Sequence, residues 1–87
     1  MNAAVTVTTT ATDLHTPYDE CDTLLDVANT SASATLYVGY SGLTTANGTP
    51  VLPGTSKKFL VPRGSTMQGR VASATLDARV VATPVRL

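Results

Sequence analysis

Cys21 and His15 are the side chains whose chemistry could do most in this sequence. A cysteine near a histidine suits a thiol nucleophile with an imidazole base, and His15, Asp19, Cys21 and Asp22 together carry ligand types that bind metal ions. The chain has one cysteine and one histidine, too few for an oriented catalytic set or a closed zinc site. We therefore expect no catalytic residue, no metal ligand and no cofactor. Cys21 is expected to pack as a small apolar side chain, with His15 on a loop.

Other chemical motifs are also missing. The six glycines fall at turn spacing and form no phosphate-binding pattern. Tyr18, Tyr37, Tyr40 and Phe59 could stack on sugars or bases. Well-spaced tyrosines in a β-domain more often lie half-buried at the edge of the core or at a subunit contact. Function must therefore be sought in surfaces, and in the elements that build them.

The size of the chain favours association with other chains. Its 87 residues include no tryptophan and one phenylalanine, and a domain of this length buries only about 60–65% of the surface that its unfolded form exposes. Small domains with thin cores usually depend on disulfides, metals or partner chains. With a single cysteine, partner chains remain, so we expect a homo-oligomer or a larger assembly.

The charges are balanced overall but unevenly distributed. Six basic and six acidic residues give a formal net charge of zero, which lacks the basic stripe of a nucleic-acid binder. Acidic residues crowd the first third and all basic residues lie in the second half. This polarity suits docking onto a charged neighbour or contact between copies, although two ordinary solvated faces remain an alternative. No segment is long and apolar enough to span a bilayer, and the first residues do not resemble a signal peptide.

Short runs with period-two alternation predict an all-β fold. β-Branched or alternating segments separated by Gly, Pro and Asn indicate about six short antiparallel strands in a small sandwich or barrel with extended terminal arms. The expected strands are residues 4–12, 24–29, 36–40, 56–62, 67–73 and 78–83.

Turn residues predict the connections between these strands. Asn47-Gly48 suits a tight turn with two positive-φ residues, and Pro53-Gly54 and Arg63-Gly64-Ser65 predict two further turns. Pro84 is expected to stop the last strand, because it has no N–H to donate. We expect residues 1–23 to form an N-terminal extended arm and acidic loop, and residues 24–87 to form the β-sandwich or barrel domain.

Part of the chain resembles small β-proteins encoded among the structural genes of tailed bacteriophages. The likeness covers roughly residues 24–83. It lies in Asp26-Val27-Ala28-Asn29-Thr30, in the run from Leu36-Tyr37-Val38-Gly39 through Thr44-Thr45-Ala46-Asn47-Gly48-Thr49-Pro50 to Pro53-Gly54, and in Ala78-Arg79-Val80-Val81. The resemblance implies a virion protein, made in the host cytoplasm, that decorates the outer capsid surface and stabilises it by binding the major capsid protein. A trimer is one form that such a homo-oligomer could take.

Two other functions stay open: a host-surface or carbohydrate-binding module of a head or tail fibre, and a head–tail connector or tail component. A small enzyme built on Cys21 is a third class, which we do not favour. No nucleic-acid or membrane partner is expected. The candidate interface residues are Val5, Val7, Thr8, Tyr37, Tyr40, Leu43, Val51 and Arg86.

Overall fold

Side chains along the long strands alternate between buried and exposed, as they must when one face of a strand meets a core. In a computed structural model that describes residues 2–18, 20–40, 42–73 and 75–85, Leu25 and Val27 are fully buried, whereas Leu24 is 39% exposed. The strands are β1 (Asn2–Val7), β2 (Thr12–Asp13), β3 (Asp22–Asn29), β4 (Leu36–Gly39), β5 (Thr49–Val51), β6 (Ser56–Val61), β7 (Gln68–Arg70) and β8 (Leu76–Val85).

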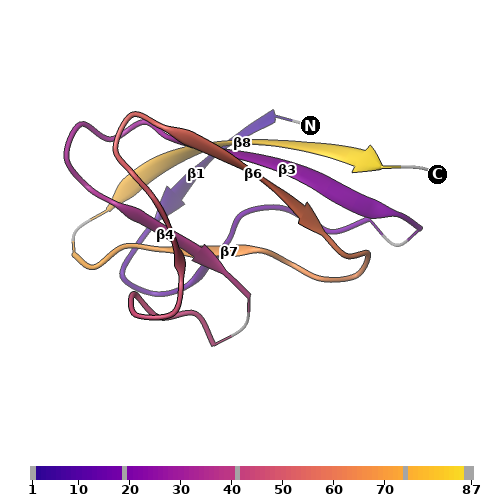
Figure 1. The fold of residues 1–87 in the computed structure, drawn as a ribbon, viewed down its shortest axis with the longest axis horizontal. Coiled ribbons are helices and arrows are strands. Elements are labelled where there is room, and N and C mark those ends of the chain that lie inside the picture. Colours follow the sequence, from indigo (N-terminus) through magenta and orange to yellow (C-terminus); the bar gives the residue numbers. More distant parts are fainter. Residues whose placement is uncertain (1, 19, 41, 74, 86–87) are drawn as a thin grey trace.

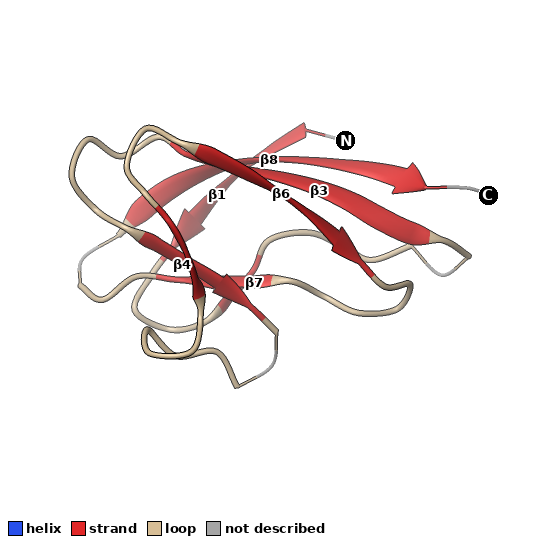
Figure 2. Ribbon diagram, in the orientation of Figure 1, coloured by secondary structure: helices blue, strands red, loops and turns tan. Residues whose placement is uncertain are grey.

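The strands of the described residues form two antiparallel sheets of four (Figure 1). Sheet A has the order β1-β8-β3-β6, and sheet B has the order β2-β7-β4-β5. The two sheets lie as layers, with the long strands β3 and β8 together in one of them, and Figure 2 shows loops and strands but no helix among the described residues. Within the described part of the chain, no helix is long and apolar enough to cross a membrane. The antiparallel all-β fold expected from the sequence is therefore confirmed, and of the two forms left open it is the sandwich, with eight strands among the described residues where about six were expected.

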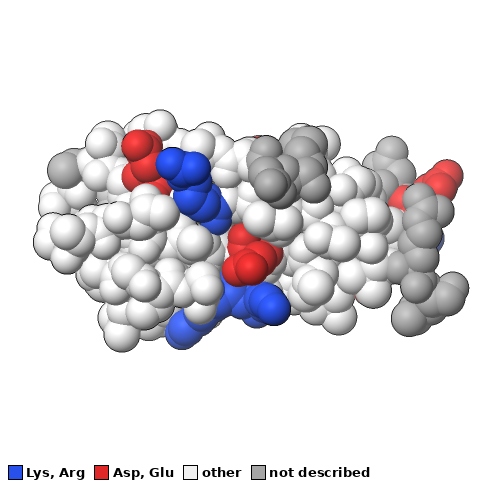
Figure 3. Space-filling model, turned by 90° about the horizontal axis from the view of Figure 1, so that it is seen from above, with Lys and Arg blue, Asp and Glu red and all other residues white. Residues whose placement is uncertain are grey.

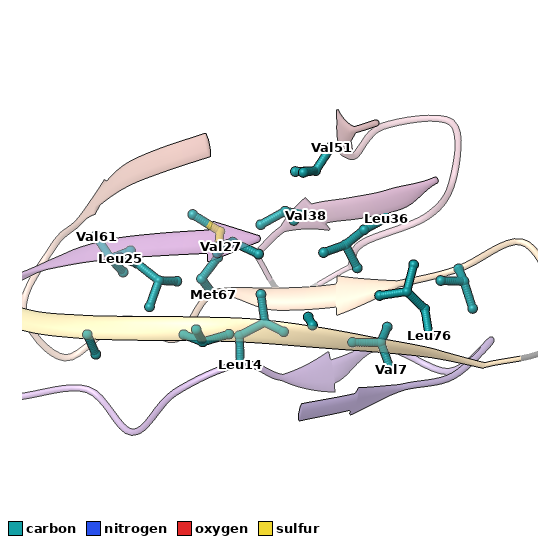
Figure 4. Packing of buried hydrophobic residues seen from close by; sticks show 14 residues of the cluster. Val7, Leu14, Leu25, Val27, Leu36, Val38, Val51, Val61, Met67 and Leu76 are labelled. Atoms are coloured by element: carbon teal, nitrogen blue, oxygen red, sulfur yellow. The ribbon is translucent and has the colours of Figure 1, made fainter. Parts of the chain in front are cut away.

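The core lies between the two sheets and consists of aliphatic side chains and one methionine. The cluster includes Leu25 and Val27 of sheet A and Leu36 and Val38 of sheet B, and Figure 4 shows Leu25 near Val61 and Val27 near Met67. Phe59 lies at the edge of this cluster and is only partly buried. Burial of each large aliphatic side chain contributes about 1.5–3 kcal/mol, so the thin core expected from the composition rests on a few Val and Leu contacts.

The N-terminal segment is part of the sandwich and does not extend away as an arm. β1 pairs with β8 from Asn2 opposite Val81 to Val7 opposite Leu76. Val7 and Leu14 both belong to the core. The described residues of the segment expected as an arm thus complete both sheets of the domain that follows them, because their apolar side chains find their partners in the same chain.

The single strand expected over residues 4–12 is two strands in different sheets. β1 ends at Val7, and the Thr8 hydroxyl then accepts a hydrogen bond from the Thr10 N–H at 3.1 Å. The Val71 N–H donates to the Thr8 carbonyl at 3.1 Å, which ties this bend to the other sheet. The chain then enters β2, which pairs with β7. A threonine turn and a tertiary contact thus override the high strand propensity of this run.

The Asn47-Gly48 prediction of a tight turn was wrong. Gly48 does not have a positive φ, and the loop between β4 and β5 is longer than two residues. The Gly48 N–H instead donates to the Thr44 carbonyl at 3.0 Å. Glycine is needed there for space, because a Cβ atom would lie 2.8 Å from the Cβ of Tyr37 and 2.8 Å from Leu43 Cδ1.

The two other turns were predicted correctly, whereas the prediction for Pro84 was wrong. Gly54 and Gly64 have φ values of 72° and 78°, and each follows a Pro or Arg in a four-residue turn as expected. Pro84 was expected to stop pairing, but it lies inside β8 opposite Thr23. Among the described residues β1 reaches only as far as Val81 along β8, so none of them pairs with Pro84 on that side, and its missing N–H breaks no described ladder bond there.

Candidate functional site

A groove of about 630 Å³ opens where β6 faces the loop between β4 and β5. The apolar side chains that line it include Val38 of β4, Phe59 of β6, and Leu43 and Met67 from loops. Polar groups, among them Asn47, Thr49 and Lys58, contribute more of its lining surface than these apolar side chains do. A hollow in which apolar and polar groups meet is the usual form of a binding site.

The groove lies along the edge of β6. Its lining includes three consecutive residues of that strand, Lys58, Phe59 and Leu60. Successive side chains of a strand point to opposite faces, so three in a row can line one hollow only when the hollow follows the edge of the strand. β6 is the last strand of sheet A and pairs only with β3 in the described part of the chain. The backbone edge of β6 that faces away from β3 therefore borders the groove.

The opposite wall of the groove is held in place by hydrogen bonds within the β4–β5 loop. The Asn47 side chain accepts from the Thr44 N–H at 2.7 Å and donates to the Gly42 carbonyl at 3.1 Å. Arg70 of β7 donates through Nη1 to the Leu43 carbonyl at 3.3 Å. Leu43 itself is 5% exposed and fixes the loop to the interior. The wall is thus preformed, and both the oxygen and the nitrogen of the Asn47 side-chain amide are engaged in hydrogen bonds within the loop.

The described lining of the groove has one basic side chain, which lies opposite an acidic residue of β3. Lys58 is the charged residue among the described residues that line it, and its neighbour Lys57 is also exposed. Asp26 lies opposite Lys58 in the β3–β6 ladder, on the outer face of sheet A. The two lysines sit on an edge strand, a position where charge discourages uncontrolled strand pairing.

A patch of exposed apolar side chains lies on the outer face of sheet A, and we call Leu24, Leu60 and Val81 the outer patch. Their exposed fractions are 39%, 61% and 39%. Leu24 and Leu60 are direct cross-strand partners, and Val81 of β8 lies diagonally from Leu24. Figure 3 views the molecule from this side and shows a surface that is mostly uncharged, with acidic and basic side chains close together. Leu60 links the outer patch to the groove.

The structure places the candidate interface residues in different environments. Val7, Leu43 and Val51 are buried in the fold, so their side chains are not available as surface contacts. Their apolar character, which suggested an interface, serves the core of this chain. Tyr40 is 45% exposed and lines the groove. Of the others, Val5, Thr8 and Tyr37 are half-buried at separate places, and Arg86 lies outside the described residues.

No hydrogen bond between His15 and Cys21, as a nucleophile and its base would make, is found among the described residues. His15 is 9% exposed, and its Nε2 accepts a hydrogen bond from the Met67 N–H at 3.0 Å. Its Nδ1 is buried without a hydrogen-bond partner among the described residues. Cys21 is a half-buried free thiol. Among the described residues, which exclude Asp19, no three His, Cys, Asp or Glu side chains gather in a group that could hold a metal ion.

The position of His15 predicts an acid-sensitive fold. Burial lowers the pKa of His15 below 6.5, and the Thr16 backbone and Asp13 oppose this only in part. The neutral ring accepts from Met67, and protonation at Nε2 would remove that acceptor. The unfolded chain therefore binds more protons below pH 6.5, and the free energy of unfolding should fall with decreasing pH by up to about 1.4 kcal/mol per pH unit, with no contribution above that pH. Urea unfolding followed by circular dichroism from pH 5 to 8 measures this slope.

The control is His15→Gln, which keeps an acceptor for the Met67 N–H but does not titrate. The free energy of unfolding of this variant should not change with pH between pH 5 and 6.5. If the free energy of unfolding falls equally with decreasing pH in both proteins, groups other than His15 cause the slope.

Comparison with known proteins adds no relative. No family model matches the chain, and neither a curated protein nor a solved structure shows significant similarity to it.

Proposed function

We propose that this protein is a structural component of a bacteriophage virion that decorates the capsid and stabilises it by binding major capsid subunits on the outer surface. The observation that carries the proposal is the outer patch, three large apolar side chains on one face of a sheet, in a chain whose turn pattern over residues 24–83 resembles phage virion β-proteins. Exposed apolar clusters of this kind mark surfaces that bind other proteins.

Binding of many copies would stabilise a shell by mass action. A ligand that binds only one state of an assembly lowers the free energy of that state by RT ln(1 + L/Kd) at each site, where L is the free ligand concentration, so the effect grows with ligand concentration and affinity and adds up over many sites. A sandwich that contacts neighbouring capsid subunits through one face would favour the assembled shell over separated subunits. The mixed charges around Leu24 and Leu60 would orient the contact more than they strengthen it.

A carbohydrate-binding role has less support. It calls for aromatic and polar side chains that converge on one pocket, and Tyr40 is the tyrosine that lines the groove among the described residues. The amide of Asn47, the polar group nearest in kind to a sugar contact, is already used within its own loop. We therefore favour a protein partner.

Quantitative mass spectrometry of purified virions tests the proposal. If the protein decorates the capsid, it is present in many copies per particle, and the double variant Leu24→Ser/Leu60→Ser is incorporated at least about tenfold less, since each buried leucine contributes about 1.5 kcal/mol or more. Leu52→Ser is the matched control, because Leu52 is 57% exposed but lies outside the outer patch. Absence from the particle, or a copy number that fits one connector ring, would refute the decoration role.

A further inference from the structure

The four outer strands of the two sheets differ in how well another strand could pair with them. β2 has two residues, and β5 has three, one of which is Pro50. A strand needs a row of free N–H and C=O groups to accept another, so these two edges offer little. β1 and β6 each have six residues. Of these two, β6 has the groove of about 630 Å³ along its edge, lined by both apolar and polar residues.

We propose that the groove binds an extended acidic segment of a partner protein, which adds to sheet A as a strand next to β6. Main-chain hydrogen bonds to β6 would provide affinity, and alternate side chains of the segment would enter the groove or face outward, as in other cases of strand addition. Inward side chains would be apolar, since Leu43, Phe59 and Met67 line the interior of the groove.

The acidic character of the segment follows from Lys58, the lysine of β6 on the outer face of sheet A. Lys57 lies opposite the buried Val27 and is on the inner face of sheet A, whereas Lys58 lies opposite Asp26 on the outer face. A segment with carboxylates at its outward positions would place one of them beside Lys58, on the side away from Asp26. The same lysines disfavour pairing between the β6 strands of two copies, because like charges would then face each other. The edge is thus selective for an acidic strand over a copy of itself. This inference does not depend on the capsid role, since it concerns what the groove accepts.

The test uses a capped peptide of alternating valine and glutamate, titrated into the full-length protein and followed by amide chemical shifts and hydrogen exchange. The peptide should shift and protect amides of residues 56–61 and 39–43. Replacing its glutamates by lysines should weaken binding about fivefold or more, and Lys58→Glu should reverse this preference. Arg79→Glu is the matched control, because Arg79 is equally a basic residue of sheet A but lies on β8, away from the groove.

Two further peptides test strand addition without altering the protein. One is N-methylated at every valine and the other at every glutamate, so that each loses the donors along one of its edges. If the peptide adds as a strand, one version retains binding and the other loses it. The proposal is overturned if no peptide binds, if both methylated versions bind equally well, or if acidic and basic peptides have the same affinity. Signals that move at β1 and not at β6 would assign the open edge to the other side of sheet A, and this too would overturn it.

Discussion

Replacing Asn29 by alanine should lower the free energy of unfolding by about 3–5 kcal/mol, since an orphaned buried partner costs about 1–3 kcal/mol. Asn29 is the last residue of β3 and is 2% exposed. Its amide donates to the carbonyls of Ala34 at 2.8 Å and Val51 at 2.9 Å, and its Oδ1 accepts from the Ser31 N–H at 3.0 Å. One side chain thus joins the end of sheet A to β5 of sheet B and to the loop between β3 and β4.

The size of the effect comes from what alanine leaves behind. Two carbonyls and one N–H lose their partners, and the bond to Val51 is buried, where water does not readily replace it. A domain of this length has a total stability of roughly 4–13 kcal/mol. Asn29→Ala would therefore remove a large share of it. Urea unfolding followed by circular dichroism gives the difference directly.

Asn29→Asp is the sharper variant. The carboxylate has the same shape as the amide but has no donor for the two carbonyls, and it would be buried close to them without a compensating charge. We expect it to be at least as destabilising as alanine at pH 7. Asn47→Ala is the matched control, because the Asn47 side chain also bonds to backbone groups but is exposed. A loss at Asn29 that is no larger than the loss at Asn47 would contradict the role assigned to burial.

The sequence could predict the strands and turns whose signals are local. β3 and β8 alternate because one face of each meets the core, and this period is visible in the residues themselves. The Pro53-Gly54 turn could be predicted equally well, since Gly at that position allows the φ of 72°. These features do not depend on which other segment lies nearby.

The features that were missed depend on tertiary contacts. The break after Val7 requires the Val71 N–H to reach the Thr8 carbonyl, and nothing in a threonine-rich run shows that. Asn47 looked like a turn residue because its role in bonding to Gly42 and Thr44 appears only once the loop is folded. Asn29 was correctly predicted to end a strand, but its hydrogen bonds to other segments were missed, although an asparagine that ends an alternating strand on its buried face is a signal that could have been used.

The groove and the outer patch could also not be predicted from the sequence. The lining of the groove depends on β6 being an edge strand, and strand order is a property of the whole fold. Apolar alternation shows that a strand has two unlike faces, but it does not distinguish the face that meets its own core from the face that meets a partner. Val7 and Val51 were therefore taken as candidate contacts, whereas Leu24 and Leu60 were not.

Leu25→Ala should lower the free energy of unfolding by about 2–5 kcal/mol, whereas Leu24→Ala should cost well under about 1 kcal/mol. The two leucines are neighbours on β3, but Leu25 is fully buried and Leu24 is 39% exposed. Truncation of Leu25 leaves a cavity between Val27 and Val61 in a core with few large side chains to fill it. Equilibrium unfolding in urea measures both losses under the same conditions.

The same two variants distinguish an effect on folding stability from an effect on partner binding. If the outer patch contacts a partner, Leu24→Ala weakens that contact while the fold remains intact, and Leu25→Ala acts only through the folded fraction. At a temperature where both variants are fully folded, Leu25→Ala should bind like the original protein and Leu24→Ala should not. Equal stability losses for the two leucines would mean that the faces of β3 are assigned wrongly, and with them both the core and the surface on which the proposed function depends.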